Sequence, residues 1–438
     1  MKKGKLLLAT VTVVAFLSSM TLANGLNLNG LGARAVAMGG AFVGLADDFS
    51  TVFWNPAGAA QFEKKYFGFS GFALLPSMSY QFDLGPVTMV DAEAPSKVYP
   101  GGLAAYYHPI NDKLVAGISV YSPSGLGVKW DGADFANISG PPNFAPNPNI
   151  KWESLLFMVT AAPSLAYKLS DQVSLGVVLN ANYTNLDLAM YAGSVEPFPG
   201  VHVDMKQQDI HMSGWGIGAT IGILAKPSDM FSIGATLRTP VKFNLSGDAT
   251  ITGIPQLGLN ETSDIETEIT WPLWAAVGVA FRPIEQFVLT FDVQYTDWNT
   301  IDVLEISFID PAWEQMMALS GENEMDFHWE RKIQIRVGAE YMVTDTLALR
   351  AGYYYDPTPS PDSTLNVLLP SATFNVITGG FGYSSNGLQF DFAVEYVMGK
   401  EREVPFLNTV MDPEWESAMP GIHGLNVLSF DFSVGYRW

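Results

Sequence analysis

Strict alternation of apolar and polar residues over long segments limits what this chain can fold into more than any other feature. In "LSFDFSVGYRW", every second residue from Leu428 to Trp438 is apolar or aromatic, and the residues between them are small, polar or charged. The same period recurs in "LQFDFAVEY", which begins at Leu388, and in "KIQIRVGAEY", which begins at Lys332. Because successive side chains of a strand point to opposite faces, this period predicts β-strands.

The alternating segments fit strands that cross a membrane better than strands of a soluble sandwich, because a sandwich must bury each apolar face against a second sheet. They run to about ten residues or more, the length of a tilted strand across a bilayer. They also end in aromatic residues, as the interfacial girdles of barrels do. Trp438 occupies the last outward position. An aromatic C-terminus of this kind resembles the signal for the barrel assembly machinery, which we expect as a partner.

Tight and long connections alternate along the chain, which independently indicates a barrel. Fourteen segments are expected to be strands: residues 65–82, 98–109, 113–123, 154–169, 172–190, 207–226, 229–250, 266–282, 285–308, 327–343, 346–356, 374–384, 387–400 and 425–438. Six connections are tight: Ile110–Asp112, Ser170–Asp171, Pro227–Ser228, Pro283–Ile284, Thr344–Asp345 and Ser385–Asn386. The seven others are long. Short periplasmic turns and long outer loops are typical of even-stranded barrels. We therefore predict an all-β transmembrane fold, a 14-stranded antiparallel outer-membrane β-barrel.

The first residues have the pattern of a secretory signal. A basic start with Lys2, Lys3 and Lys5 leads into the apolar stretch Leu6–Leu17 and a small-residue cleavage site. The apolar stretch is too short to span a bilayer as a helix. We therefore expect residues 1–23 to be a signal peptide.

Composition narrows the location and the partners. Hydrophobic residues make up 48% of the chain, yet no run of 18 apolar residues follows the leader, so membrane helices are not expected. The absence of cysteine excludes disulfides and fits the bacterial envelope. The formal net charge of −21 argues against nucleic acid as a partner. We expect a monomeric protein of the bacterial outer membrane, without cofactor or metal, in contact with membrane lipid and lipopolysaccharide.

The segment before the first predicted strand, residues 24–64, does not alternate and is rich in Gly and Ala. A barrel of fourteen strands is too wide for its own wall side chains to fill. We therefore expect residues 24–64 to form a hatch that plugs the lumen, and residues 65–438 to form the barrel. The residues expected to support this hatch are Arg34, Gly39, Gly40, Asp47 and Asp48.

The hatch contains a short motif, Asn55, Pro56 and Ala57, which we interpret as a rigid turn. Pro56 fixes φ and removes a hydrogen-bond donor, and the side chain of Asn55 can bond to nearby backbone.

The stretch "GLGARAVAMGGAFVGLADDFSTVFWNPAGAA" resembles the N-terminal hatch of FadL-type outer-membrane transporters, which carries an Asn-Pro-Ala motif. The resemblance continues at "VYSPSGLGVKW", "FVLTFDVQYTDWNTIDVLEISF", "LALRAGYYYDPTPSPD" and the closing strand, and so covers nearly the whole chain. It implies transport of hydrophobic molecules, chiefly long-chain fatty acids and in some branches aromatic hydrocarbons. It also implies capture in external loops, a pocket above the hatch, and lateral exit through a gap at a kinked third strand.

A gap of that kind has a physical basis at Pro123 and Gly125, which end the third predicted strand. Proline cannot donate a ladder hydrogen bond, and an interrupted ladder leaves a wall opening, with Asn55–Ala57 expected nearby. The alternative is that Pro123 begins an ordinary loop.

Two groups of residues are candidates for ligand contact. The long loops contain methionine and aromatic side chains suited to an adaptable apolar capture groove: Trp130, Trp313, Met316, Met317, Trp415 and Met419. Packing between loops is the alternative for these residues. On the lumen face, Arg336 and Arg350 could meet a ligand carboxylate. Structural pairing with Glu340, Asp292 or Asp391 is the alternative, and it is favoured.

The charge of the loops bears on the substrate. Residues 309–326 carry a net charge of −5 and residues 401–424 a net charge of −4. Such loops repel a fatty carboxylate, although salt screens the effect beyond about 10 Å. A neutral hydrocarbon is therefore the alternative ligand. Acidic loops could also bind divalent cations that bridge lipopolysaccharide molecules.

A barrel enzyme and a general diffusion porin are the two alternatives to a transporter of hydrophobic molecules. A barrel enzyme needs a nucleophile and a base, but none of the histidines falls in a recognisable catalytic motif: His108, His202, His211, His328 and His423. A general diffusion porin keeps an open lumen and has no N-terminal plug. We therefore expect a transporter rather than an enzyme or a porin.

Overall fold

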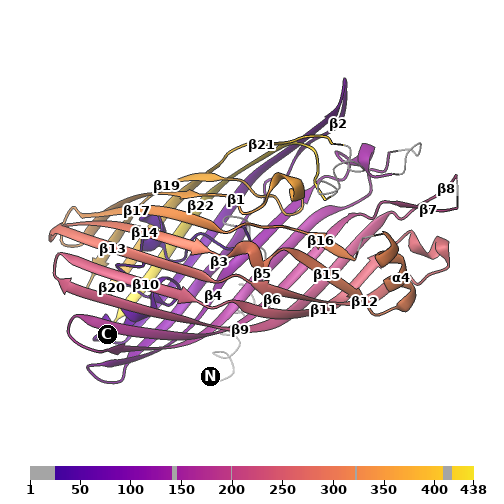
Figure 1. Ribbon diagram of the computed structural model, residues 1–438. Helices are drawn as coiled ribbons and strands as arrows, with labels where there is room; N and C mark the ends of the chain where they lie inside the picture. The colour runs from indigo at the N-terminus through magenta and orange to yellow at the C-terminus, as the bar shows by residue number, and fades with distance from the viewer. Residues whose placement is uncertain (1–24, 141–145, 199, 321–322, 408–416) are drawn as a thin grey trace, which may run out of the picture.

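The computed structural model describes residues 25–140, 146–198, 200–320, 323–407 and 417–438. The signal peptide predicted for residues 1–23 lies outside them. In the described residues, the wall is a closed antiparallel sheet of fourteen strands, which confirms the predicted fold (Figure 1). The ring closes where the first and last strands pair, from Tyr66 opposite Arg437 to Gln81 opposite Ile422.

The wall strands follow one another around the ring in chain order. They are β1 (Tyr66–Leu84), β3 (Tyr99–Pro109), β4 (Leu114–Trp130), β5 (Trp152–Lys168), β6 (Val173–Tyr191), β9 (Gln207–Ser228), β10 (Phe231–Arg238) with β11 (Val241–Ile251), β12 (Thr262–Trp271) with β13 (Trp274–Ile284), β14 (Phe287–Thr296) with β15 (Val303–Phe308), β16 (Glu324–Asp326) with β17 (Lys332–Met342), β18 (Leu347–Asp356), β19 (Phe374–Ser385), β20 (Leu388–Gly399) and β22 (Gly421–Arg437). Short strands extend the outer end: β2 (Val87–Glu93), β7 (Ser194–Phe198), β8 (Val201–Asp204) and β21 (Arg402–Val404).

Three predicted strands are each divided into two in the structure. Residues 229–250 are divided at Thr239–Pro240, and residues 266–282 at Pro272–Leu273. Proline lacks the N–H that the ladder needs, so each division falls where proline interrupts the pairing. The third, residues 285–308, is divided by the 3-10 helix η4 (Trp298–Thr300).

Alternation along the strands separates a membrane face from a lumen face. In β22, the outward side chains from Phe430 to Tyr436 are 38–46% exposed, whereas Ser429, Asp431 and Ser433 are buried. The outward ring of Trp438 stacks on Tyr436 at 5.6 Å. The chain thus presents an apolar band to lipid and a polar face to its interior. Among the described residues, no helix is long and apolar enough to cross a membrane.

The two ends of the barrel differ. Six tight connections lie at one end, and the long connections gather at the other, together with the β1–β2 hairpin, the β7–β8 hairpin and helix α4 (Pro311–Ser320) (Figure 1). Two of the predicted tight connections, Pro227–Ser228 and Pro283–Ile284, belong to the ends of β9 and β13, and the turns follow at residues 229–230 and 285–286. Inward-facing side chains at this second end form an extended apolar cluster. By the usual orientation of outer-membrane barrels, the tight turns face the periplasm and the long connections face outward.

Residues 25–62 lie inside the ring of strands, and we call them the N-terminal segment. They contain α2 (Ala33–Ala37), α3 (Thr51–Trp54) and the 3-10 helix η1 (Pro56–Gln61). Helix α2 contacts β18, β19, β20 and β22, whereas η1 contacts β5, β6 and β9 on the opposite side of the ring. The segment, indigo in Figure 1, therefore extends across the bore, nearer the end with tight turns.

Candidate functional site

A network of arginines and carboxylates holds the N-terminal segment to one side of the wall. Arg34 of α2 donates to both carboxylate oxygens of Glu340, at 2.8 and 2.9 Å, and to Asp47 at 2.5 Å. Arg350 donates to the same Glu340 at 2.6 Å and to Asp391 at 2.8 Å. Burial opposes the charge of Arg34, but the carboxylates of Asp47 and Glu340 outweigh it, so the pKa of Arg34 lies well above its ordinary value. Glu340 is thus the bridge between two buried guanidinium groups.

The two arginines proposed to meet a ligand carboxylate are placed differently. The side chain of Arg350 is 4% exposed and forms ion pairs with Glu340 and Asp391, which agrees with the alternative of structural pairing. Arg336 is also buried, and it donates to the carbonyl oxygen of Gly39 at 3.1 Å. Its guanidinium lies 4.2 Å from the ring centre of Tyr354. In this structure Arg336 joins the wall to the segment directly, whereas Arg350 contacts the segment's partner Glu340 and not the segment itself.

Gly39 and Gly40 form a turn that presses against the wall. Their φ angles are +66° and +65°, a conformation that favours glycine. A Cβ on Gly39 would lie 2.8 Å from the carbonyl oxygen of Val337 in β17. The next turn of the segment is held by Asp48, which accepts hydrogen bonds from the amide and hydroxyl of Ser50 at 2.8 and 2.6 Å. Burial raises the pKa of Asp48 above its usual value, although the charge of Arg34 opposes this.

Several glycines on the lumen face of the wall lie where the segment comes closest to it. Gly352 of β18 faces the lumen, and a Cβ there would collide with the backbone of Met38 and Gly39. A Cβ on Gly176 of β6 would collide with the backbone of Pro56 and Ala57, and a Cβ on Gly222 of β9 would collide with the side chains of Asn55 and Pro56. The wall therefore lacks side chains where the segment makes its closest approach.

We expect Gly352→Ala to weaken the docking of the segment by about 1–3 kcal/mol, because overpacking a well-fitted contact has a cost of that size. Hydrogen exchange of the amides of residues 33–42 measures this as faster opening. The matched control is Gly379→Ala on the next strand, where the added methyl would face outward, 3.8 Å from its nearest neighbour. Equal exchange in the two variants would contradict the tight contact at Gly352.

The Asn-Pro-Ala motif holds the segment to β9, on the side of the wall opposite α2. The amide nitrogen of Asn55 donates to the carbonyl oxygens of Val43 and of Ile223 in β9, both at 3.0 Å. Its amide oxygen accepts from the N–H of Ala57 at 3.1 Å, and Pro56 begins η1. The motif's hydrogen bonds thus fix neighbouring parts of the segment and wall rather than the interruption at Pro123.

The third wall strand, β4, is interrupted at Pro123 and then resumes. Pairing with β5 shifts register between Tyr121 and Ser124, and β4 continues to Trp130. The alternative that Pro123 begins an ordinary loop is therefore wrong, since the strand goes on for seven residues beyond it. On its other side, β4 pairs with β3 only through Leu103–Pro109. The ladder between β3 and β4 thus ends below the interruption.

The first residues of the N-terminal segment take the place of the missing ladder. The N–H of Leu28 donates to the carbonyl oxygen of Pro123 at 3.0 Å, and that of Gly125 to Leu26 at 3.3 Å. Asn27 and Ser124 form an antiparallel bridge, and their side chains are 2.9 Å apart. We call Leu26–Leu28 the sealing strip. Sequence reasoning missed it, because a three-residue strand carries no periodic signal.

A cavity of about 30 Å³ lies beside the interruption, and Arg238 enters it. The guanidinium donates to the carbonyl oxygen of Phe53 at 3.0 Å and lies between the rings of Phe53 and Trp274, at 4.8 and 5.0 Å. Its Nε is buried without a hydrogen-bond partner. In the part of the chain that the structure describes, no carboxylate forms an ion pair with Arg238. A partly buried cation without an anion is therefore available at this site.

The rest of the cavity combines apolar and neutral polar side chains. The lining includes Tyr121, Met158, Trp271, Asn180 and Asn182. Sequence analysis overlooked Arg238, although alternation through Ser232, Gly234 and Thr236 places it on the lumen face.

The residues proposed to capture a ligand lie mostly in the apolar cluster at the outer end. Trp130, Trp313 and Met317 are buried, and the indole nitrogen of Trp130 donates to the carbonyl oxygen of Val367 at 3.0 Å. Met316 and Met419 are half-buried against the same cluster. Trp415 lies outside the described residues. Packing between loops therefore accounts for the buried members. Among the residues described, no three His, Cys, Asp or Glu gather as a metal site.

Comparison with known proteins decides the family. The model of a family described as outer membrane protein transport protein (OMPP1/FadL/TodX) matches residues 14–420, which is most of the chain. The chain belongs to this FadL family. It is a β-barrel of the bacterial outer membrane, and named members of its family carry hydrophobic compounds.

Individual relatives agree with this assignment. The long-chain fatty acid transport protein of Escherichia coli is 24% identical, over 90% of this FadL family chain and 91% of its own length. A putative outer membrane protein of Neisseria meningitidis is also 24% identical, over 92% of this chain and 88% of its own. A Pseudomonas aeruginosa FadL homologue superposes with a TM-score of 0.74 at 18% identity, and covers 94% of this chain and 99% of that one. The Pseudomonas putida toluene transporter TodX gives 0.72 at 18% identity, with the same coverage.

Proposed function

We propose that this protein carries long-chain fatty acids across the outer membrane and that Arg238 receives the carboxylate on the way. The observation that supports this is the guanidinium of Arg238, which faces a lumen cavity and has no carboxylate partner among the described residues. Desolvating a cation is costly unless an anion compensates it. A fatty acid brings that anion, and its carboxylate forms charge-assisted hydrogen bonds with a guanidinium.

The surroundings of Arg238 suit the remainder of a fatty acid. Aromatic and aliphatic side chains border the cavity on the side of the outer end, where Trp271 and Val241 lead into the apolar cluster. A carboxylate at Arg238 would thus leave an alkyl chain against apolar surface, which is the usual composition of a ligand site. Half-buried Met316 and Met419 would contribute to capture at the outer end.

In the same proposal, residues 25–62 act as the hatch, and the interruption in β4 is the exit. Pro123 and Ser124 border both the cavity and the broken ladder. Only the sealing strip, among the described residues, hydrogen bonds to β4 at Pro123 and Gly125 on the side facing β3. Withdrawal of this strip would connect the cavity with the lipid outside the wall.

Replacement of Arg238 tests the substrate class. We expect Arg238→Gln to lower the affinity of the purified protein for palmitate about 10- to 100-fold, because a hydrogen bond to a charged group contributes about 1.5–3 kcal/mol. Affinity for a neutral alkane of equal length should not change. The control is Arg331→Gln, since Arg331 lies on an exposed connection, 3.0 Å from Asp297. Equal palmitate affinity in wild type and Arg238→Gln would refute the role of Arg238.

A neutral hydrocarbon is the second candidate ligand, favoured by the acidity of the outer connections. Residues 309–326 carry a net charge of −5, and four of their five acids lie at described, solvent-accessible positions: Asp310, Glu314, Glu324 and Asp326. Tight binding of toluene or an alkane by wild type, without binding of palmitate, would support this candidate instead.

A further inference from the structure

The sealing strip has a second attachment to the wall, on a strand that is not adjacent to β4. The amide oxygen of Asn27 accepts a hydrogen bond from the hydroxyl of Ser124 at 2.9 Å and another from the indole N–H of Trp271 at 2.8 Å. Ser124 belongs to β4 and Trp271 ends β12, and all three residues line the Arg238 cavity. Since β4 pairs with β3 and β5, one side chain of the strip joins two separate parts of the wall across the cavity.

Trp271 lies at the boundary between the cavity and the apolar cluster at the outer end. It is 7% exposed and belongs to that cluster, as does Leu26 of the strip. The indole packs edge to face on Phe243, with ring centres 6.1 Å apart. Tyr121 lines the same cavity but packs in a different cluster, together with side chains of the N-terminal segment. Trp271 is therefore the hydrogen-bonded partner of the strip on the side of the outer end.

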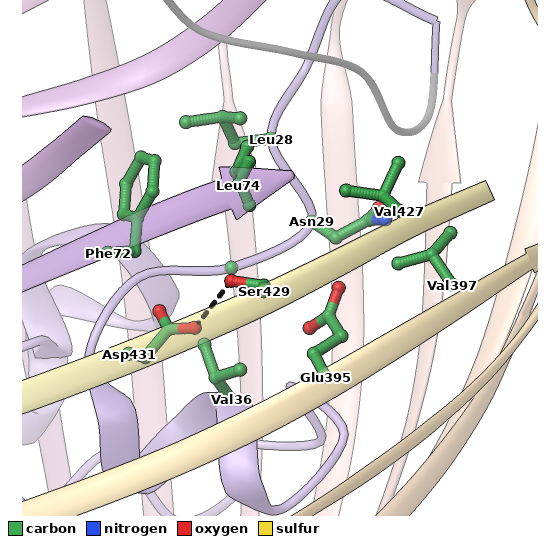
Figure 2. Close-up of a pocket in the computed structure, with 11 residues that line it drawn as sticks. Leu28, Asn29, Val36, Phe72, Leu74, Glu395, Val397, Val427, Ser429 and Asp431 are labelled. Atoms are coloured by element: carbon green, nitrogen blue, oxygen red, sulfur yellow. Dashed lines mark hydrogen bonds between the residues drawn. The ribbon is translucent and has the colours of Figure 1, made fainter. Parts of the chain in front are cut away.

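Beyond the strip, the N-terminal segment is held less firmly. Figure 2 shows Leu28 near Leu74 of β1 and Asn29 near Val427 of β22, at a cavity of about 20 Å³. Asn29 is 7% exposed, and neither its amide oxygen nor its amide nitrogen has a hydrogen-bond partner among the described residues. A buried polar group without a partner costs about 1–3 kcal/mol. The polar contacts that fix the strip are therefore those of Asn27 and the backbone hydrogen bonds with β4.

A ligand can enter the Arg238 cavity only if part of the lining moves. The cavity measures about 30 Å³. A space of roughly 10–15 Å³ holds one water-sized particle, so the cavity has room for about two of them. A carboxylate with its alkyl chain needs far more room. Because Trp271 borders both the cavity and the outer cluster, the hydrogen bond between Trp271 and Asn27 lies where such a ligand would arrive.

We propose that Trp271 is a positioning residue of a gate on the outer side of the cavity, and that it closes this gate by holding Asn27. Ser124, bound to the same amide oxygen, closes the exit through β4. Asn27 would thus part from Trp271 when a ligand enters from the outer end, and from Ser124 when the ligand leaves through the wall. The inference rests on the proposed transport, but it requires no carboxylate and applies equally to a neutral hydrocarbon.

Replacing Trp271 by phenylalanine keeps an aromatic ring and removes the N–H. A neutral hydrogen bond contributes about 0.5–1.5 kcal/mol, so Trp271→Phe should open the gate about 2- to 10-fold more often. We expect the association and dissociation rates of palmitate with the purified protein to rise together by that factor, because a gate limits both directions. Loss of a direct ligand contact would instead raise mainly the dissociation rate. Trp152→Phe is the matched control, since Trp152 is also buried and donates to Ser139 at 3.0 Å rather than to the strip.

A second variant shows whether the hydrogen bond to Asn27 is responsible. Asn27→Leu removes the shared acceptor, so adding Trp271→Phe to it should change the rates no further. An alkane of the length of palmitate should respond to Trp271→Phe in the same way, whereas failure of the fatty acid proposal would appear as alkane binding without palmitate binding. Without any ligand, the amides of Leu28 and Gly125 should exchange about 2- to 10-fold faster in Trp271→Phe than in wild type. Ligand rates in Trp271→Phe that equal those of wild type, or a rise in the dissociation rate alone, would overturn the proposal, and so would unchanged exchange.

Discussion

Replacing Glu340 by glutamine is expected to release the N-terminal segment from the wall and to turn a closed barrel into a steady ion conductor. Glu340 accepts hydrogen bonds from Arg34 of the segment and from Arg350 of the wall, the latter at 2.6 Å. The substitution removes the negative charge that Arg34 and Arg350 share, so neither guanidinium group keeps its contact with this carboxylate. Breaking a buried ion pair from one side costs about 3–5 kcal/mol, because the remaining charge is uncompensated. This free-energy cost destabilises the state in which the segment is docked against the wall.

Planar-bilayer conductance measures the result directly. The wild-type bore is crossed by residues 25–62, so we expect a low current, whereas Glu340→Gln should show long-lived open steps. Glutamine has nearly the volume of glutamate, so the wall itself should still assemble, and the loss of one charge is the main change. Glu285→Gln, at an exposed position in a tight turn and without an ion pair among the described residues, serves as the control. A variant that stays as closed as wild type would show that Asp47 alone suffices to hold Arg34.

The wall was predictable from the sequence because membrane and lumen impose different demands on successive residues. Phe430, Asp431 and Phe432 follow that rule one by one, and each takes the expected face. Alternation did not predict the breaks within two strands, because Pro240 and Pro272 interrupt the strand pairing without disturbing the alternation of apolar and polar residues. Pro123 was recognised as an interruption, yet the resumption of β4 beyond it depends on pairing with β5, far along the chain.

The site was less predictable, because partners come from strands distant in sequence. Arg238, Arg336 and Arg350 all lie on lumen faces, and alternation treats them alike. Only the fold shows that Arg350 faces Asp391 of β20, that Arg336 lies under the Gly39 turn, and that Arg238 is left without a carboxylate partner among the described residues. The Asn-Pro-Ala motif could be recognised from local chemistry, but its attachment to Ile223 of β9 could not.

A reversible lock between the sealing strip and β4 is expected to abolish uptake. The chain has no cysteine, so the pair Asn27→Cys and Ser124→Cys introduces a single possible disulfide. The two positions are antiparallel bridge partners with side chains 2.9 Å apart. Partners of this kind have Cα atoms about 4.5–5.5 Å apart, within the range of about 4.4–6.8 Å that a disulfide spans. Cells with the oxidised double variant should take up no more labelled palmitate than cells without the protein.

The lock distinguishes exit through the wall from passage along the bore, because it holds only Leu26–Leu28 in place. A reductant should restore uptake in the double variant and leave the single variants Asn27→Cys and Ser124→Cys unchanged. Palmitate binding to the oxidised protein in detergent should persist if Arg238 is reached from the outer end, since the lock closes only the far side of that cavity. Normal uptake through the locked protein would mean that the strip does not move and that the ligand leaves by another route. Because two backbone hydrogen bonds hold the sealing strip to β4, this part of the wall opens at a small cost in hydrogen bonds.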